Sequence, residues 1–219
     1  MTANNLRGTL CIWTDIDPEY EADFNRWYDT EHMQERVAIP GFQHARRFKC
    51  LDACERPYLA LYCTDDIGVF NSPSYRQAFA EQTTWSLTNF QRMRNTQRRV
   101  GELRIECGEG EGGALSQWVL PAEKVNMSRL VSMLGQAVDS PRLTSATVLV
   151  TEPSLSVSLT AKGAALPPAD ALVMIEGSDP VATRQACTDI ASAFGVADVY
   201  TFSMLWRLAA KTSIHKELL

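Results

Sequence analysis

The stretch DFNRWYDTEHMQERVAIPGF (residues 23–42) combines aromatic, acidic and basic side chains in a run that has the character of a helix and ends at a proline. Asp17 followed by Pro18 supplies an N-cap and a proline at the first helical position, which is a common helix start. Pro40 ends the helix before the next strand. We therefore expect one helix over residues 18–38, and the question is which of its charged side chains face the protein interior.

Most apolar side chains of this helix fall in one arc, about 120° wide, when each residue is advanced by about 100°. They are Tyr20, Phe24, Trp27, Tyr28, Ala38 and Ile39. Glu31 and Glu35 fall inside the same arc, and His32 falls at its edge. The side chains outside the arc are Asp23, Arg26, Asp29, Thr30 and Arg36. The pattern therefore predicts that two carboxylates point toward the core.

Carboxylates that face an apolar interior lose their hydration, so their pKa rises and they become candidates for acid/base work. His32 lies one turn after Tyr28 and three residues before Glu35, so these side chains can meet on the helix. We interpret His32, Glu31 and Glu35 as candidate catalytic residues. The alternative is that both glutamates pair with an arginine of the next strand in a buried structural cluster.

The next expected strand, GFQHARRFKC (residues 41–50), alternates two sets of side chains. The set that we expect to face inward comprises Phe42, His44, Arg46, Phe48 and Cys50. His44 and Arg46 would then lie opposite the helix and complete a polar cluster with His32. Arg46 would either bind a substrate carboxylate or neutralise a glutamate. On the first strand, Trp13 is either a core residue or part of a ligand wall.

The order of expected elements is the same before and after a glycine-rich break, GEGEGG (residues 108–113). Before the break we expect strand 8–16, helix 18–38, strand 41–50, strand 57–64, helix 72–93 and strand 97–107. After it we expect strand 114–121, helix 126–138, strand 145–153, strand 170–177, helix 180–194 and strand 198–209. Each half therefore has the β-α-β-β-α-β order of a ferredoxin-like unit.

We predict an α+β fold of two tandem ferredoxin-like units, residues 1–108 and 114–219, with a linker at 109–113. Each antiparallel sheet needs cover on the face opposite its helices. The two sheets can cover each other and close into a barrel-like core, so the halves would form a pseudo-dimer. The first helix of the second unit has no histidine or acid on its apolar face, which indicates a single site, in the first unit.

Composition excludes several function classes. The 219-residue chain has a net charge of -5 and a pI near 5.3, which does not favour a nucleic-acid partner. No apolar run is long enough for a membrane helix and the first residues lack a signal-peptide pattern, so we expect a cytoplasmic protein with no membrane partner. Six scattered cysteines and three histidines favour reduced thiols and no metal site. No dinucleotide or phosphate motif is present, so we expect no cofactor.

The run FNRWYDTEHMQERVAIPGFQHARRF (residues 24–48) resembles the motif region of the EthD-like members of the dimeric α/β-barrel superfamily. The run SPSYRQAF (residues 72–79) is similar to their second helix. The resemblance covers roughly residues 8–107 and implies that barrel fold, with the second half as a diverged copy that lacks the motif. Members of the superfamily include muconolactone-type isomerases, polyketide cyclases, cofactor-free monooxygenases and haem-handling enzymes. They commonly hold a small molecule between helices and sheet, and haem is the least expected ligand because its axial histidine usually comes from outside the stretch carrying His32.

The residues and the resemblance together predict a cofactor-independent enzyme that performs acid/base chemistry on a small carbonyl or aromatic-type catabolite, as an isomerase, cyclase or lyase. His32 would be the base and Glu31 or Glu35 its partner. The side chains expected to bind the substrate are Tyr28, His44, Arg46, Trp13 and Trp27. Two alternatives are a cofactor-free monooxygenase and a non-catalytic ligand-binding or structural protein. Met33 and Val37, expected to be exposed, hint at a homodimer.

Overall fold

The computed structural model describes residues 6–157 and 165–211. The elements of the first half are β1 (Gly8–Ile16), η1 (Pro18–Tyr20), α1 (Glu21–Trp27), η2 (Tyr28–His32), α2 (Met33–Val37), β2 (Phe42–Cys50), β3 (Tyr58–Thr64), η3 (Ile67–Asn71), α3 (Pro73–Ala80), α4 (Thr84–Arg92) and β4 (Met93–Gly108). Those of the second half are β5 (Ala114–Pro121), η4 (Ala122–Lys124), α5 (Met127–Val138), β6 (Leu143–Thr151), α6 (Pro153–Ser156), β7 (Asp170–Gly177), α7 (Pro180–Ala193) and β8 (Tyr200–Ala209). The predicted order of strands and main helices is confirmed in both halves.

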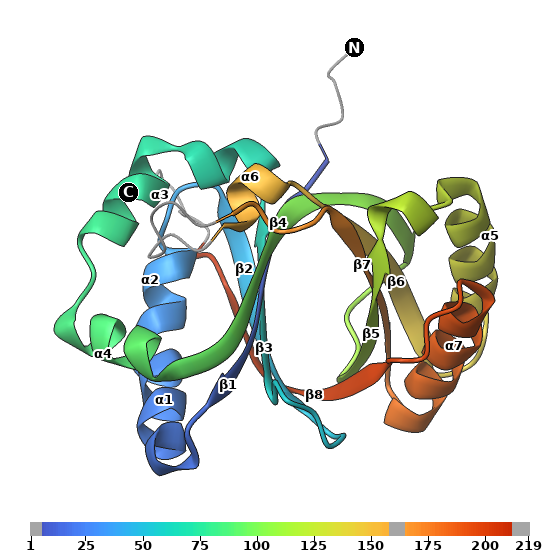
Figure 1. Cartoon of the computed structure of the whole chain (residues 1–219), viewed down its shortest axis with the longest axis horizontal. Helices are drawn as coiled ribbons and strands as arrows, with labels where there is room; N and C mark the ends of the chain where they lie inside the picture. Colours follow the sequence, from blue (N-terminus) through green and yellow to red (C-terminus); the bar gives the residue numbers. More distant parts are fainter. Residues whose placement is uncertain (1–5, 158–164, 212–219) are drawn as a thin grey trace, which may run out of the picture.

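The eight strands form one closed antiparallel barrel in the order β1-β3-β2-β8-β5-β7-β6-β4 (Figure 1). Each half contributes a four-stranded ferredoxin-like sheet, and the sheets join where β2 pairs with β8 and where β4 pairs with β6. At the second junction the backbones come very close, because a Cβ on Gly101 of β4 would meet the carbonyl of Val150 in β6. The predicted pairing of two sheets into one intramolecular barrel is confirmed.

Apolar side chains pack in three clusters. Two of them fill the space between helices and sheet, one in each half, and Figure 1 shows these helix layers on opposite flanks of the barrel. The third cluster lies inside the barrel and contains residues of both halves, including Trp13, Phe48, Leu115 and Phe202. The barrel interior is therefore a shared core, in addition to the core that each half builds under its own helices.

The helix expected over residues 18–38 is present, but it is not a continuous α-helix. It begins as a 3-10 turn, runs as α1, widens into the π turn η2 and continues as α2. A π turn holds one residue more than an α turn, so the side chains after it are rotated by about 100° relative to an uninterrupted α-helix. The inward-facing arc that was predicted by advancing about 100° per residue is therefore correct from Phe24 to Tyr28 and wrong for the residues after Tyr28.

This rotation makes the prediction for the two glutamates wrong. Glu31 and Glu35 are partly exposed, while Ala38 is exposed. The residues that follow the two glutamates face inward instead: His32 has 6% of its surface exposed and Arg36 has 2%. His32 therefore lies inside the apolar face and not at its edge, and Arg36 is inside rather than outside.

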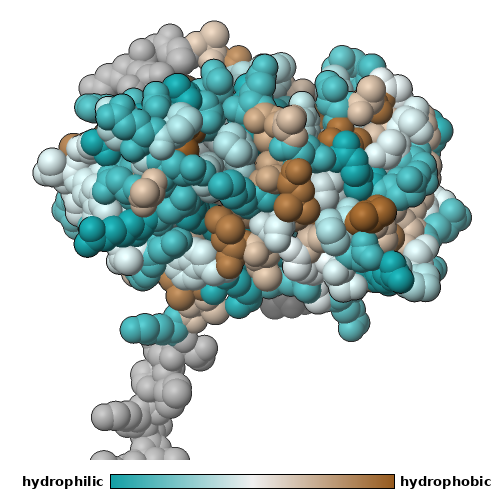
Figure 2. Space-filling model, turned by 90° about the horizontal axis from the view of Figure 1, so that it is seen from below, coloured by the Kyte–Doolittle hydropathy of each residue, from teal (hydrophilic) through white to brown (hydrophobic). Residues whose placement is uncertain are grey.

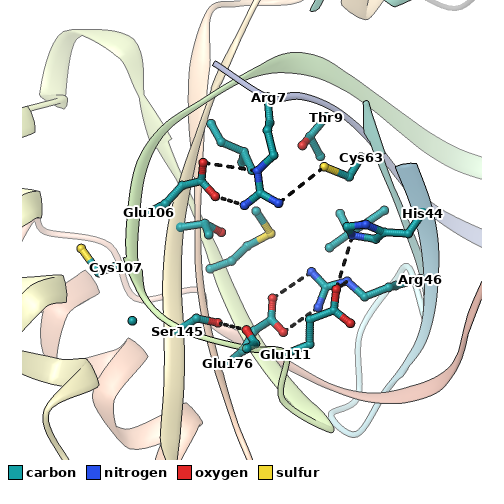
Figure 3. A pocket seen from close by; sticks show the side chains of 16 residues that line it. Arg7, Thr9, His44, Arg46, Cys63, Glu106, Cys107, Glu111, Ser145 and Glu176 are labelled. Atoms are coloured by element: carbon teal, nitrogen blue, oxygen red, sulfur yellow. Dashed lines mark hydrogen bonds and ion pairs between the residues drawn. The ribbon is translucent and has the colours of Figure 1, made fainter. Parts of the chain in front are cut away.

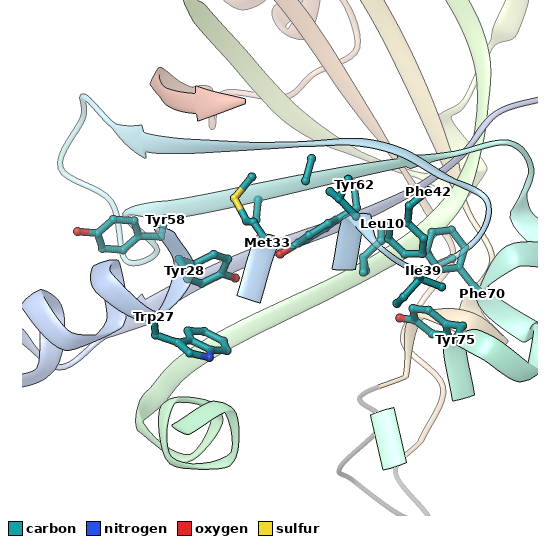
Figure 4. Packing of buried hydrophobic residues seen from close by; sticks show 14 of the residues in the cluster. Leu10, Trp27, Tyr28, Met33, Ile39, Phe42, Tyr58, Tyr62, Phe70 and Tyr75 are labelled. Atoms are coloured by element: carbon teal, nitrogen blue, oxygen red, sulfur yellow. The ribbon is translucent and has the colours of Figure 1, made fainter. Parts of the chain in front are cut away.

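The same rotation buries Met33 and Val37, which we expected on an exposed face. Their side chains pack in the cluster between helices and sheet, where Figure 4 shows Met33 among its aromatic neighbours. The hint of a homodimer that rested on these two residues is therefore removed.

Strand β2 contains a bulge that separates the side chains expected on one face. Its pairing with β3 shifts between Phe42 and His44. Phe42 packs on the helix side of the sheet, whereas Phe48 packs inside the barrel. His44 and Arg46 alternate along the strand with the same phase as Phe48. The prediction that they lie opposite His32 is wrong, because the sheet separates them from it.

The second helix of the first half, expected over residues 72–93, is divided into α3 and α4 by residues 81–83. Each part has its own N-cap, Ser72 for α3 and Thr83 for α4. The division makes two shorter helices that close the helix layer over the sheet.

The exposed surface carries no obvious large apolar area on the face drawn in Figure 2, where hydrophobic side chains form small patches separated by hydrophilic ones. The large apolar side chains that are exposed come from six separate segments; they are Leu51, Leu87, Val131, Leu166, Val181 and Leu205. Within the described residues, no helix has the length and apolar character needed to cross a membrane.

Candidate functional site

A cavity of about 300 Å³ lies between the helices and the sheet of the first half. Its lining residues are Leu10, Ile12, Tyr28, His32, Arg36, Tyr62, Phe79, Phe90, Met93, Thr96 and Arg98. Most of this lining is aliphatic or aromatic, with a few polar groups that converge from the π turn, α2, β3 and β4. Such a combination is typical of sites that bind small organic molecules.

His32 presents a neutral imidazole to this cavity. Its ring lies 4.2 Å from the Trp27 ring and 5.6 Å from the Phe90 ring, measured between centroids. Burial lowers the pKa of His32 well below its usual value, and the positive charges of Arg36 and Arg47 lower it further. Its Nδ1 is buried and makes no hydrogen bond to a described residue. A neutral imidazole that lines a cavity can accept a proton from a bound molecule.

Arg36, like Tyr62, is a functional candidate that the sequence did not indicate. Its Nη2 donates to Oε1 of Gln82 at 3.0 Å, and the same atom lies 3.8 Å from Oε2 of Glu35. Its guanidinium carbon lies 4.8 Å from the centre of the Phe79 ring. Nε and Nη1 are buried and find no acceptor among the described residues. No local sequence pattern places this side chain inward; only the π turn does.

Tyr28 and Tyr62 add two phenol groups to the cavity wall. Both line the cavity, and Figure 4 shows the hydroxyl of each directed toward the other tyrosine. Burial raises the pKa of Tyr28, although the nearby Arg47 partly offsets the effect. Burial, followed by the neighbouring Tyr28, raises the pKa of Tyr62 well above its usual value. Both hydroxyls are therefore protonated at neutral pH and can donate hydrogen bonds.

The π turn is fixed by contacts of Asp29. Its Oδ1 accepts hydrogen bonds from Arg47 Nη1 at 3.1 Å and from Trp206 Nε1 at 2.8 Å. Its carbonyl accepts one from Gln34 Nε2 at 2.9 Å. Because Arg47 belongs to β2 and Trp206 to β8, both halves of the chain hold the turn that positions His32.

The predicted partners Glu31 and Glu35 do not line the cavity. Glu31 accepts a hydrogen bond from Thr83 Oγ1 at 2.6 Å and a longer one from Ser86 Oγ at 3.4 Å, so it attaches the π turn to the start of α4. Burial raises the pKa of Glu35, while Arg36 partly offsets this shift. The structure therefore brings neither glutamate into contact with the cavity-facing side of His32.

His44 and Arg46 line a different cavity of about 260 Å³ inside the barrel (Figure 3). Arg46 donates from Nη1 and Nη2 to the two carboxylate oxygens of Glu176, at 2.6 and 2.9 Å. The backbone nitrogen of Gly112 donates to the same carboxylate at 3.1 Å. Of the two roles open to Arg46, neutralising a glutamate is the one observed, and the glutamate is Glu176 of the second half.

His44 lies 3.5 Å from Oε1 of Glu111, measured from its Nε2. Even so, burial and then the positive charges of Arg46 and Arg207 lower the pKa of His44 to about 4. Its imidazole is therefore neutral at neutral pH, and it forms part of the charged lining of the barrel interior, not of the site beneath the helices.

The two candidate tryptophans also occupy different places. Trp13 packs inside the barrel, and its Nε1 donates to the carbonyl of Arg56 at 2.6 Å. Trp27 is fully buried behind His32, and its Nε1 donates to Ser86 Oγ at 3.0 Å. Trp27 thus supports the imidazole from behind, whereas Trp13 is a core residue. Among the residues that the structure describes, no group of three or more potential ligands could hold a metal ion.

Neither a protein-family profile nor a curated protein sequence matches the chain. Solved structures do match its fold along almost the whole length. An anthrone oxidase-like protein aligns with a TM-score of 0.61 and 12% identity over 98% of this chain and 97% of its own. A provisionally named monooxygenase from Lactobacillus acidophilus NCFM aligns with a TM-score of 0.54 and 9% identity over 94% of this chain and 97% of its own.

A mutant chlorite dismutase from Candidatus Nitrospira defluvii, solved in complex with cyanide, aligns with a TM-score of 0.51 and 7% identity over 92% of each chain. At these identities the comparisons speak to the fold alone, and the narrower EthD-like resemblance stays a prediction. They show that the chain has the dimeric α/β-barrel fold, with both units of the barrel in one polypeptide.

Proposed function

We propose that the chain is an enzyme that binds a small organic molecule in the cavity under the helices and uses His32 as a general base. The observation that carries the proposal is the neutral imidazole of His32, which lines a mostly apolar cavity. Its lowered pKa keeps it in the proton-accepting form.

The reaction that we propose begins with removal of a proton next to a carbonyl group. His32 takes the proton, the electrons of the C–H bond form an enolate, and the negative charge develops on the carbonyl oxygen. Tyr28 and Tyr62 line the same cavity with protonated hydroxyls and would donate hydrogen bonds to that oxygen. Return of the proton to another carbon completes an isomerisation, and transfer to a leaving group completes a lyase step; neither requires a cofactor.

A monooxygenase is the second candidate. It is favoured by the aromatic walls of the cavity and by the fold shared with an anthrone oxidase-like protein and a provisionally named monooxygenase. In this case His32 would take a proton from a hydroxylated aromatic compound. The resulting anion would supply electrons to dioxygen, with one oxygen atom retained in the product and the other released as water.

A haem does not fit this cavity. His32 is the only histidine in its lining, its Nδ1 is fully buried, and its ring is packed between Trp27 and Phe90. A volume of about 300 Å³ suits a small molecule and not a macrocycle. We therefore assign no step to such a group.

Two assays distinguish the isomerase or lyase from the monooxygenase. Proton exchange of small carbonyl compounds in D₂O, followed by NMR, reports the enolisation step, and an oxygen electrode with hydroxylated aromatics reports oxygen uptake. For whichever reaction is found, we expect His32→Ala to lower kcat by roughly 100-fold or more, because it removes the base. Glu31→Gln is the matched control, since Glu31 does not line the cavity. Full turnover by His32→Ala would show that the assignment is wrong.

A further inference from the structure

Two arginines of the first half are almost completely buried under the helices, and their partners differ. Arg47 has 1% of its surface exposed and donates from both Nη atoms, to Asp29 at 3.1 Å and to Asn25 at 2.7 Å. Its guanidinium also lies 4.1 Å from the centre of the Tyr28 ring. The Nε of Arg47 has no acceptor among the described residues, but its charge is compensated by a carboxylate, an amide and an aromatic face.

Arg36 is buried to the same degree, with 2% of its surface exposed, and its compensation is incomplete. Only Nη2 has a hydrogen-bond acceptor, and that acceptor is the uncharged amide of Gln82. The carboxylate of Glu35 lies 3.8 Å from the same Nη2, beyond hydrogen-bond distance, and about a third of its side chain is exposed. Nε and Nη1 have no acceptor among the described residues. A guanidinium stays charged in any protein environment, so its two unpaired donors need acceptors, and an anionic acceptor would also neutralise the charge.

The position of Arg36 directs this unmet charge toward the cavity. It contributes to the lining together with His32 and Tyr62, and its guanidinium packs against the Phe79 ring. The rest of the lining is largely apolar, including Leu10, Phe90 and Met93. It also contains Arg98, which donates from Nε to the carbonyl of Leu155 and from Nη2 to the hydroxyl of Tyr75, so it differs from Arg36 in having acceptors. A ligand that satisfies both features has one anionic group and an apolar, flat body.

We propose that Arg36 binds the anionic group of the substrate, and that the substrate is a small organic monoanion with an apolar body, such as a carboxylate. This inference rests on the proposed function in one respect, that the cavity beneath the helices holds the substrate. Two N–H groups of one guanidinium match the two oxygens of a carboxylate, and the desolvated site favours an anion over a neutral molecule of equal size.

The first test compares binding of benzoate and of benzamide, its neutral counterpart of similar size, by isothermal titration calorimetry. We expect the wild-type chain to bind benzoate at least 10-fold more tightly than benzamide, and Arg36→Met to bind both with equal, weak affinity. Arg36→Lys keeps the charge and should keep part of the preference. Arg129→Gln removes an exposed positive charge of α5 and should leave the preference unchanged. No preference in the wild-type chain, or a preference that survives in Arg36→Met, would overturn the proposal.

The second test separates a ligand-binding arginine from a structural one by the melting temperature without ligand. Arg36→Met removes a buried charge that lacks a full set of partners, so we expect an unchanged or higher melting temperature. Arg47→Met, the paired arginine, should melt several degrees lower. An equal loss of stability in the two variants would mean that Arg36 is structural and would overturn the proposal.

Failure of the proposed catalysis and failure of this inference give different results. His32→Ala keeps Arg36, so it should still prefer benzoate over benzamide even though it lacks the base and one side chain of the cavity lining. If His32→Ala retains turnover but the benzoate preference depends on Arg36, the catalytic assignment fails and the anion site stands. If His32→Ala loses turnover and no preference for benzoate exists, the anion site fails and the catalytic assignment stands.

Discussion

Trp206 donates a hydrogen bond from Nε1 to Oδ1 of Asp29 at 2.8 Å, and this bond joins the last strand of the second half to the π turn of the first. The turn carries His32 at its end and is followed by the helix that carries Arg36. The second half therefore takes part in shaping a cavity that is lined by the first half alone.

A double-mutant cycle measures this coupling. Trp206→Phe should lower the free energy of unfolding by about 1 kcal/mol, because it removes a charge-assisted hydrogen bond at a partly exposed site. Asp29→Asn should cost more, because it also removes the counter-charge of the buried Arg47. The double variant should lose less than the sum of the two, as expected for residues in contact. Trp85→Phe provides the control, since Trp85 bonds to Asp23 instead; its effect should add to that of Asp29→Asn. Urea denaturation of the six chains gives the comparison: the wild type, the three single variants and the two double variants that contain Asp29→Asn.

Deletion of Thr30 should convert the π turn into an α turn without loss of the fold. The deletion removes the extra residue, so His32 and Arg36 keep their inward positions in a regular α-helix. We expect a melting temperature within a few degrees of the wild-type value. Deletion of Gln34 is the control, because it rotates the residues that follow and moves Arg36 away from the cavity. If deleting Thr30 lowers the melting temperature as severely as deleting Gln34, the claim that the π turn contains one extra residue would be contradicted.

Breaking the ion pair between Arg46 and Glu176 should be strongly destabilising. Removal of either partner by Arg46→Met or Glu176→Gln leaves the other buried without its counter-charge, which costs about 3–5 kcal/mol. The double variant Arg46→Met, Glu176→Leu removes both charges and should recover much of that loss. The exposed pair of Arg142 and Asp179 is the reference, and Arg142→Gln should cost less than about 1 kcal/mol. Chemical denaturation at pH 7 gives the free energy of unfolding of each variant for this comparison.

The two buried histidines should make the protein less stable in mild acid. The pKa of each is lowered in the folded state, to about 4 for His44 and well below the usual value for His32. As the pH falls below about 6.5, the unfolded chain binds protons that the folded chain does not, so folding is disfavoured by up to roughly 1 kcal/mol per pH unit and histidine. Above pH 7 both histidines are neutral in both states and the effect disappears.

The measurement is the dependence of unfolding free energy on pH between 7.5 and 5 for the wild-type chain, His44→Asn and His32→Asn. Each substitution should reduce the slope below about pH 6.5 and leave it unchanged above pH 7. An unchanged slope in both variants would show that the imidazoles titrate normally in the folded protein.

We also propose that the units 1–108 and 114–219 need each other to fold, since the barrel interior is a core shared by both. A chain cut within residues 109–113 should give two fragments that are unfolded when separate and form the barrel when mixed. Circular dichroism of each fragment and of the mixture tests this. A stable, well-folded fragment 1–108 on its own would contradict it.

The sequence by itself determined the fold. The repeated β-α-β-β-α-β order, the caps at Asp17 and Ser72, and the alternation of the strands are local signals, and each depends on neighbours within a few residues. The sheets then had one apolar face each without cover, and covering them required a barrel. The buried face of the helix from Phe24 to Tyr28 could also be predicted, because the helix is regular up to Tyr28.

The tertiary structure alone decided which polar side chains reach the cavity. A single extra residue in the π turn, fixed by Asp29 through strands β2 and β8, moved the inward places from Glu31 and Glu35 to His32 and Arg36. A bulge in β2 likewise placed His44 and Arg46 inside the barrel, where Arg46 meets Glu176, 130 residues away in sequence. Helical and strand periodicity assume a constant rotation per residue, and a one-residue irregularity held by distant contacts changes every face that follows it.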